Sequence, residues 1–97
     1  MIPVKRIEII VDELELPNVL KVLDAAGVSG YTVIKDATGK GDRGLRDGDD
    51  LTGVFANSYV MTACPGEKLD LIVESVRPIL KQRGGVCLVS EAQWIVH

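Results

Sequence analysis

The sequence contains few residues of the kinds that usually carry catalysis or covalent cross-links. His97 is the only histidine, and at the last position of the chain it would be a poorly held general base. None of the serines belongs to a recognised nucleophile motif. Cys64 and Cys87 are too few for a disulfide framework and form no C-x-x-C pair, so we expect small buried residues, with a redox role as the alternative. We therefore expect no catalytic residues and no enzyme activity.

Two further absences concern partners and location. The 97 residues include 11 Lys and Arg against 14 Asp and Glu, which gives a formal net charge of −3. Domains that bind nucleic acid usually carry a basic surplus, so we expect no nucleic-acid partner. No apolar run approaches the roughly 18 residues of a membrane span, and no charged-then-apolar leader is recognisable. These features predict a cytoplasmic protein.

The length fits one small domain that occupies residues 1–97. Alternating β-branched residues indicate strands, and apolar residues at helical spacing indicate helices. Pro17 suits a first helical turn, Gly27 suits a left-handed helix end, and Pro78 predicts a bend rather than a stop in the second helix. The elements expected from these patterns are strands over 4–11, 31–35, 57–64 and 86–89, and helices over 16–26 and 67–83.

The order of these elements, βαββαβ, is typical of the ferredoxin-like plan in the α+β class. It predicts an antiparallel four-stranded sheet with both helices on one face, because right-handed crossovers place them on the same side. No further element is left to cover the other face. The strand over 57–64 has apolar residues on both of its faces, which is typical of a strand that is buried on both faces or meets a partner. We therefore expect a homo-oligomer.

Half of the ten glycines fall within fifteen positions, from Gly39 to Gly53. In the first part of this stretch, 39–46, three glycines are interspersed with Lys40, Arg43 and Arg46. Backbone N–H groups of such stretches can converge on an anion, and arginine offers a fork that matches phosphate or carboxylate oxygens. The stretch is neither a P-loop nor a dinucleotide-binding fingerprint. The residues leave two interpretations open: an anion-binding loop, and a solvated hairpin whose charges only confer solubility, which the residues alone favour slightly because G-K-G fragments are common.

Three aspartates, Asp47, Asp49 and Asp50, follow in the same stretch. Hard divalent cations prefer carboxylate oxygens, but this spacing matches no calcium loop. We therefore favour a solvated acidic loop tip over a metal site. The aspartates could also pair with Arg43 and Arg46 when no ligand is bound, which would give the loop two states.

Three stretches of the sequence resemble the PII signalling superfamily. They are residues 27–33 (GVSGYTV), residues 39–46 (GKGDRGLR) and the apolar pattern over 69–80 that precedes Gly84 and Gly85. Together with the βαββαβ order, the resemblance extends over nearly the whole chain. The pattern GKGxRxxR is specific to the PII-like branch associated with bicarbonate uptake and carboxysomes. The chain resembles the carboxysome-associated members more closely, because it lacks the cysteine-bearing C-terminal extension of some bicarbonate-transporter regulators.

The resemblance implies a homotrimer that binds an adenine nucleotide in each of three clefts between subunits. It also implies a T-loop over about 39–56, which begins at the phosphates, and a B-loop over about 83–86, which closes the site. The first three residues of the second strand would lie near adenine or ribose, and the glycines and cations of the T-loop would meet phosphates or a second anion. The ligand-binding residues implied in this way are Tyr31, Thr32, Val33, Gly39, Lys40, Gly41, Arg43, Arg46, Met61, Thr62, Gly84, Gly85 and Val86.

Two departures from the family pattern bear on the nucleotide. Val86 stands where ordinary PII proteins carry a lysine that grips the outer phosphates, and the tail lacks the paired arginines that many of them contribute from a neighbouring subunit. A triphosphate would be less well neutralised here, so the resemblance favours AMP or ADP. It also implies bicarbonate binding, because a small planar oxyanion can use the same arginine fork and loop amides.

The function implied is signalling: ordering of the T-loop would report nucleotide and bicarbonate to a bicarbonate transporter or a carboxysome component. The alternative is a ferredoxin-like oligomeric adaptor that docks a carboxysomal or membrane partner without a small-molecule ligand. A third possibility, an enzyme of small-molecule metabolism on the same scaffold, is disfavoured by the scarcity of catalytic residues.

Overall fold

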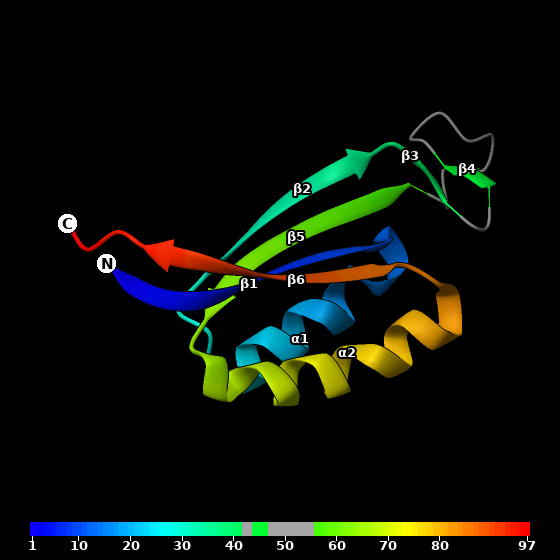
Figure 1. Ribbon diagram of the computed structural model, residues 1–97. Helices are drawn as coiled ribbons and strands as arrows, with labels where there is room; N and C mark the ends of the chain where they lie inside the picture. The colour runs from blue at the N-terminus through cyan, green and yellow to red at the C-terminus, as the bar shows by residue number, and fades with distance from the viewer. Residues whose placement is uncertain (42–43, 47–55) are drawn as a thin grey trace.

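Four antiparallel strands form the main sheet, and two helices cover one of its faces (Figure 1). The structure is a computed structural model and describes residues 1–41, 44–46 and 56–97. The strands are β1 (Ile2–Asp12), β2 (Tyr31–Ala37), β5 (Asn57–Cys64) and β6 (Val86–Trp94), in the order β2-β5-β1-β6. The helices are α1 (Leu16–Ala26) and α2 (Leu69–Arg83). This arrangement confirms the predicted ferredoxin-like α+β fold.

Strand β1 lies in the middle of the sheet and supplies the centre of the core. Its alternating residues Ile7, Ile9 and Val11 are fully buried beneath the two helices. Each helix contributes a stripe of apolar residues to the same core, as the helical spacing predicts. The fully buried partners are Val19 and Leu23 of α1, Val60 of β5, and Ile72 and Val76 of α2.

The ends of both helices follow the residues that predicted them. Pro17 lies in the first turn of α1, and Gly27 ends this helix in the left-handed conformation with φ 73°. Helix α2 continues through Pro78 and ends at Gly84, so the proline does not stop the helix. Two short 3-10 turns, η1 (Glu13–Glu15) and η2 (Gly66–Lys68), precede the helices. The second helix therefore begins as a 3-10 turn at the position where a regular helical turn was expected.

The glycine-rich stretch contains more regular structure than the long loop expected there. Strands β3 (Gly39–Gly41) and β4 (Gly44–Arg46) pair antiparallel in a small separate sheet. Just before it, β2 has an irregular register between Ile34 and Ala37, where Asp36 adopts a positive φ of 60°. The predictions for Arg43 and for Asp47, Asp49 and Asp50 lie outside the described residues.

The sheet face that points away from the helices is covered by no element of the described chain (Figure 1). We call it the open face. Cross-strand register places the even-numbered residues of β1 and β6 on it. Several of its apolar side chains are about half exposed, among them Ile34 at 55%, Leu88 at 56% and Trp94 at 51%. Such a patch is unusual on an isolated subunit and is typical of an interaction surface.

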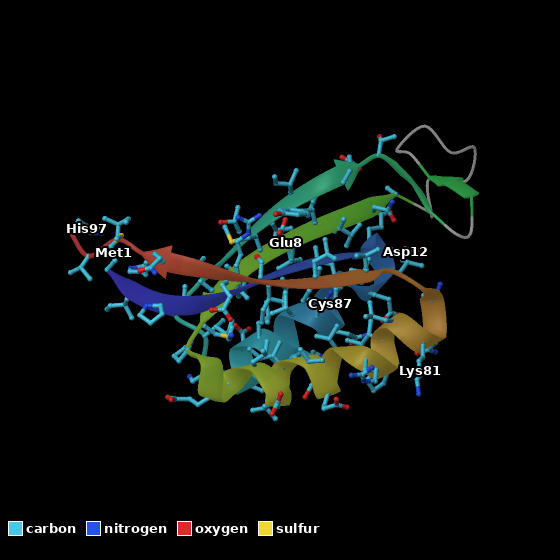
Figure 2. All side chains as sticks on the ribbon, viewed as in Figure 1. Met1, Glu8, Asp12, Lys81, Cys87 and His97 are labelled. Atoms are coloured by element: carbon cyan, nitrogen blue, oxygen red, sulfur yellow. The ribbon has the colours of Figure 1, made fainter. Side chains whose placement is uncertain are left out.

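The two cysteines behave as the sequence predicts. Cys64 is buried and Cys87 is partly buried, and both thiols are free. Figure 2 shows Cys87 on the side of the sheet that faces the helices. Burial raises the pKa of each thiol, which disfavours the reactive thiolate. Within the described residues, no helix is long and apolar enough to cross a membrane.

Candidate functional site

The predicted adenine-side residues come from two neighbouring strands, but they do not all face the same way. Thr32 of β2 is directly opposite Met61 of β5, and Tyr31 is directly opposite Thr62. Met61 is partly buried on the open face, whereas Thr62 is buried on the helix side at 2% exposure. The hydroxyl of Thr62 donates a hydrogen bond of 2.6 Å to the Gly30 carbonyl.

The side chains of Met61 and Thr62 therefore lie on opposite faces of the sheet. Successive residues of a strand point to opposite faces, so two neighbours in sequence cannot both present side chains to one face. The Thr62 hydroxyl instead fixes the turn that leads into β2. Val33 is opposite the buried Val60 and shares the helix side with Tyr31. Among the predicted residues of β2 and β5, Thr32 and Met61 are the two whose side chains share the open face.

The described residues of the predicted anion-binding motif follow the end of β2. Gly39 pairs with Arg46, and Gly41 pairs with Gly44, in the β3–β4 hairpin. Lys40 lies in the same hairpin, directly opposite Leu45. The hairpin therefore brings the first glycine and the last arginine of the motif next to each other in space. Figure 1 shows that the hairpin extends beyond the end of the main sheet.

The turn between α2 and β6 has a backbone that only glycine adopts easily. Gly84 has φ 79° and Gly85 has φ 129°. A Cβ atom at Gly85 would lie 2.7 Å from the carbonyl oxygen of Ile10, closer than real Cβ atoms come to a backbone atom. The N–H of Gly84 donates to the Leu80 carbonyl at 2.8 Å and closes the end of α2. Gly84 therefore shapes the turn, and its N–H is engaged with the end of α2.

A single chain does not bring the hairpin residues and the glycine turn together. The β3–β4 hairpin follows β2, at one edge of the sheet, and Gly84 and Gly85 lead into β6, which begins with Val86 at the other edge. Strands β5 and β1 lie between them, so the two edges are about 14 Å apart at the usual strand spacing. Both groups nevertheless lie at the same end of the sheet (Figure 1). Among the described residues, no group of three acidic, cysteine or histidine side chains could hold a metal ion.

A polar cluster that the sequence reasoning did not single out lies in the middle of the apolar open face. The Tyr59 hydroxyl donates to Glu8 Oε2 at 2.6 Å, and Arg6 Nη2 donates to Glu8 Oε1 at 2.8 Å. Figure 2 shows Glu8 on the side of the sheet away from the helices. The hydrogen bond from Tyr59, and then that from Arg6, lower the pKa of the Glu8 carboxyl. The same hydrogen bond raises the pKa of Tyr59.

The family model for nitrogen regulatory protein P-II matches residues 4–96. This chain belongs to the PII family. Proteins of this family are signalling regulators, and the match spans all four strands of the main sheet and both helices. Among the curated proteins, no sequence matches the chain significantly.

Several solved structures share the PII fold of this chain. The structure of CPII from Thiomonas intermedia K12, bound to ADP, AMP and bicarbonate, is 30% identical with a TM-score of 0.87 over 95% of this chain and 88% of that one. A second structure of CPII, bound to ADP and bicarbonate, is 32% identical with a TM-score of 0.84 over the same shares. A PII-like protein from Thermus thermophilus has 18% identity, a TM-score of 0.72 and coverage of 94% and 87%, which supports the fold alone.

The turn before β6 gives a direct test of the described backbone. Gly85→Ala forces a side chain against the Ile10 carbonyl at an unfavourable φ, so the free energy of unfolding should fall by about 1–3 kcal/mol. Gly30→Ala is the matched control, because a Cβ atom there meets nothing within 4 Å. Its effect should stay within about 0.5 kcal/mol. Urea denaturation of both variants measures the difference, and equal losses would contradict the described turn.

The Glu8 cluster should make the melting temperature of the protein depend on pH in the acid range. Because the pKa of Glu8 is lowered on folding, the ionised carboxylate stabilises the folded protein above the unfolded-state pKa. This stabilisation is lost as the pH falls through the lowered folded-state pKa, so melting temperatures should drop between about pH 5 and pH 3. Glu8→Gln should flatten that drop, and Glu67→Gln, at an exposed position, should not. Parallel melting curves for the wild type and Glu8→Gln would refute the assignment.

Proposed function

We propose that this PII protein is a trimeric sensor of an adenine nucleotide, AMP or ADP, and of bicarbonate. The nucleotide binds in clefts between subunits. One sheet edge contributes β2 and the β3–β4 hairpin to a cleft, and the opposite edge, from a second subunit, contributes the turn at residues 84–86. The observation that carries this proposal is the placement of the two groups at the same end but at opposite edges of the sheet. A second copy of the chain provides the edge that a single copy lacks. The ligands in the CPII structures, ADP, AMP and bicarbonate, support the choice of ligands.

The chemistry of the motif agrees with these ligands. Lys40, Arg43 and Arg46 supply positive charge beside several glycines, and this combination suits phosphate or bicarbonate oxygens. Occupancy of the site orders the T-loop, residues 39–56, and the ordered loop engages a bicarbonate transporter or a carboxysome component in the cytoplasm. The regulated process is inorganic-carbon uptake or carboxysome function.

Titration calorimetry tests the ligands directly. AMP and ADP should bind, each with and without bicarbonate, and ATP and cyclic AMP complete the panel. Arg43→Ala and Arg46→Ala should each weaken ADP binding about tenfold or more, because a charge-assisted hydrogen bond is worth about 1.5–3 kcal/mol. Arg77→Ala is the matched control, since Arg77 is exposed on α2 and pairs with Glu74 of the same helix.

The absence of heat with every nucleotide in the wild type would reject the sensor and favour the ligand-free adaptor. Equal affinity in Arg43→Ala, Arg46→Ala and Arg77→Ala would show that ADP binds elsewhere on the protein. Melting temperatures provide a second readout, because a ligand that binds only the folded state raises them.

The assembly is tested by light scattering after size exclusion. The wild type should have about three times the mass of the 10.5 kDa chain. Leu88→Asp places a charge on the open face, so it should shift the mass towards the single chain. Leu71→Asp is the matched control, because Leu71 is equally exposed, at 59%, but lies on α2. A wild type that elutes as a single chain, or a Leu88→Asp variant that remains a trimer, would overturn the proposed interface.

A further inference from the structure

An ion pair joins the start of one helix to the end of the other, next to the turn at residues 84–86. Arg83, the last residue of α2, places Nε 3.3 Å from Oε1 of Glu15. Glu15 is the last residue of η1, and its side chain is only 9% exposed. Its second oxygen, Oε2, accepts a hydrogen bond of 3.2 Å from Asn18 Nδ2. A carboxylate this well buried needs such partners, because an unpaired charge there would be costly.

The segment that carries Glu15 is itself held firmly in place. The side chain of Asp12 accepts a hydrogen bond of 3.0 Å from the Leu14 N–H, which caps η1. The Glu13 N–H donates to the Ala56 carbonyl at 2.8 Å, one residue before β5 begins. Glu15 therefore projects from a turn that is attached both to β1 and to the residue preceding β5. It forms a fixed anchor point for the end of α2.

The turn that Arg83 leads into is costly to order. Gly84 and Gly85 follow Arg83 directly, and two adjacent glycines lose more conformational entropy on ordering than any other pair of residues. Beneath the turn, Gly85 packs against the backbone of Ile10. The Glu15–Arg83 pair restrains it from the helix side. Restraint from two sides fixes the turn before any ligand arrives. Such preorganisation raises the affinity for a ligand, because less conformational entropy is lost on binding.

We propose that Glu15 is a positioning residue for the nucleotide site: it holds Arg83 and thereby fixes the glycine turn that borders the ligand. This inference rests on the proposed function, because it assigns the turn to that ligand site. Arg83 then acts as a tether and not as a phosphate ligand. The other arginine on α2, Arg77, forms its ion pair within its own helix and does not reach across to η1.

Hydrogen exchange tests the anchor without any ligand. In Glu15→Gln and in Arg83→Gln, the amides of residues 84–86 should exchange about tenfold faster than in the wild type. Glu74→Gln is the matched control, because it removes a glutamate–arginine pair from the exposed side of α2 and should leave those amides unchanged. Unchanged exchange at 84–86 in both Glu15→Gln and Arg83→Gln would overturn the inference. Arg83 is exposed, so its variant remains informative if Glu15→Gln folds poorly.

Calorimetry with ADP tests the consequence for binding. Both Glu15→Gln and Arg83→Gln should bind ADP about three- to tenfold more weakly, and the charge-exchanged double variant Glu15→Arg with Arg83→Glu should recover part of the loss. If Arg83 touched the phosphates itself, Glu15→Gln would release it and leave ADP affinity equal or higher, and this outcome overturns the positioning role. A wild type that binds no nucleotide at all rejects the proposed function and, with it, the assignment of the turn to a ligand site.

Discussion

The alternation of side chains along β1 is the constraint on which the rest of the structure depends. This strand pairs with β5 on one side and β6 on the other. The direction of its side chains therefore determines which residues of the neighbouring strands face the helices and which face away from them. Ile7, Ile9 and Val11 turn towards the helices and form the core. A register slip of one residue would send these three side chains to the open face and bring Glu8 beneath the helices. Burial of three large apolar side chains is far more favourable than burial of one carboxylate, so the observed register is strongly preferred.

The same central strand determines where the candidate site lies. Because β1 and β5 occupy the middle of the sheet, the hairpin that follows β2 and the turn that precedes β6 must lie at opposite edges. The strand directions place both at one end, so each edge carries one part of a possible ligand site. An assembly in which sheets meet through their open faces would bury apolar residues such as Leu88 and bring unlike edges together. Association of the subunits and formation of the ligand site would then both depend on the strand order of the sheet.

Two polar groups modify this otherwise apolar arrangement, and they differ in kind. The cluster of Glu8, Tyr59 and Arg6 lies within the open face, where Tyr59 and Arg6 both donate hydrogen bonds to the Glu8 carboxylate. The pair of Glu15 and Arg83 lies on the helix side and connects two elements end to end. Each group links residues from two different elements of the fold.

Local patterns in the sequence were sufficient for most of the fold. Alternation along β1, helical spacing in α1 and α2, Pro17 at a helix start and Gly27 at a helix end all depend on residues close together in the chain. The glycine-rich motif at residues 39–46 was also recognisable, because its chemistry lies in neighbouring residues. The sequence left open whether this stretch forms a hairpin, because glycine-rich segments carry little β-propensity of their own.

The sequence by itself determined the elements, their order and the charge of the candidate anion-binding motif. Only the tertiary structure decided which residues meet. Glu8 and Tyr59 are 51 residues apart in sequence and become neighbours through the register of β1 and β5. The burial of Thr62, the engaged N–H of Gly84 and the pairing of Glu15 with Arg83 likewise depend on how distant segments pack. Local propensity contains no information about such contacts, because they form only when strand pairing and helix packing bring the segments together.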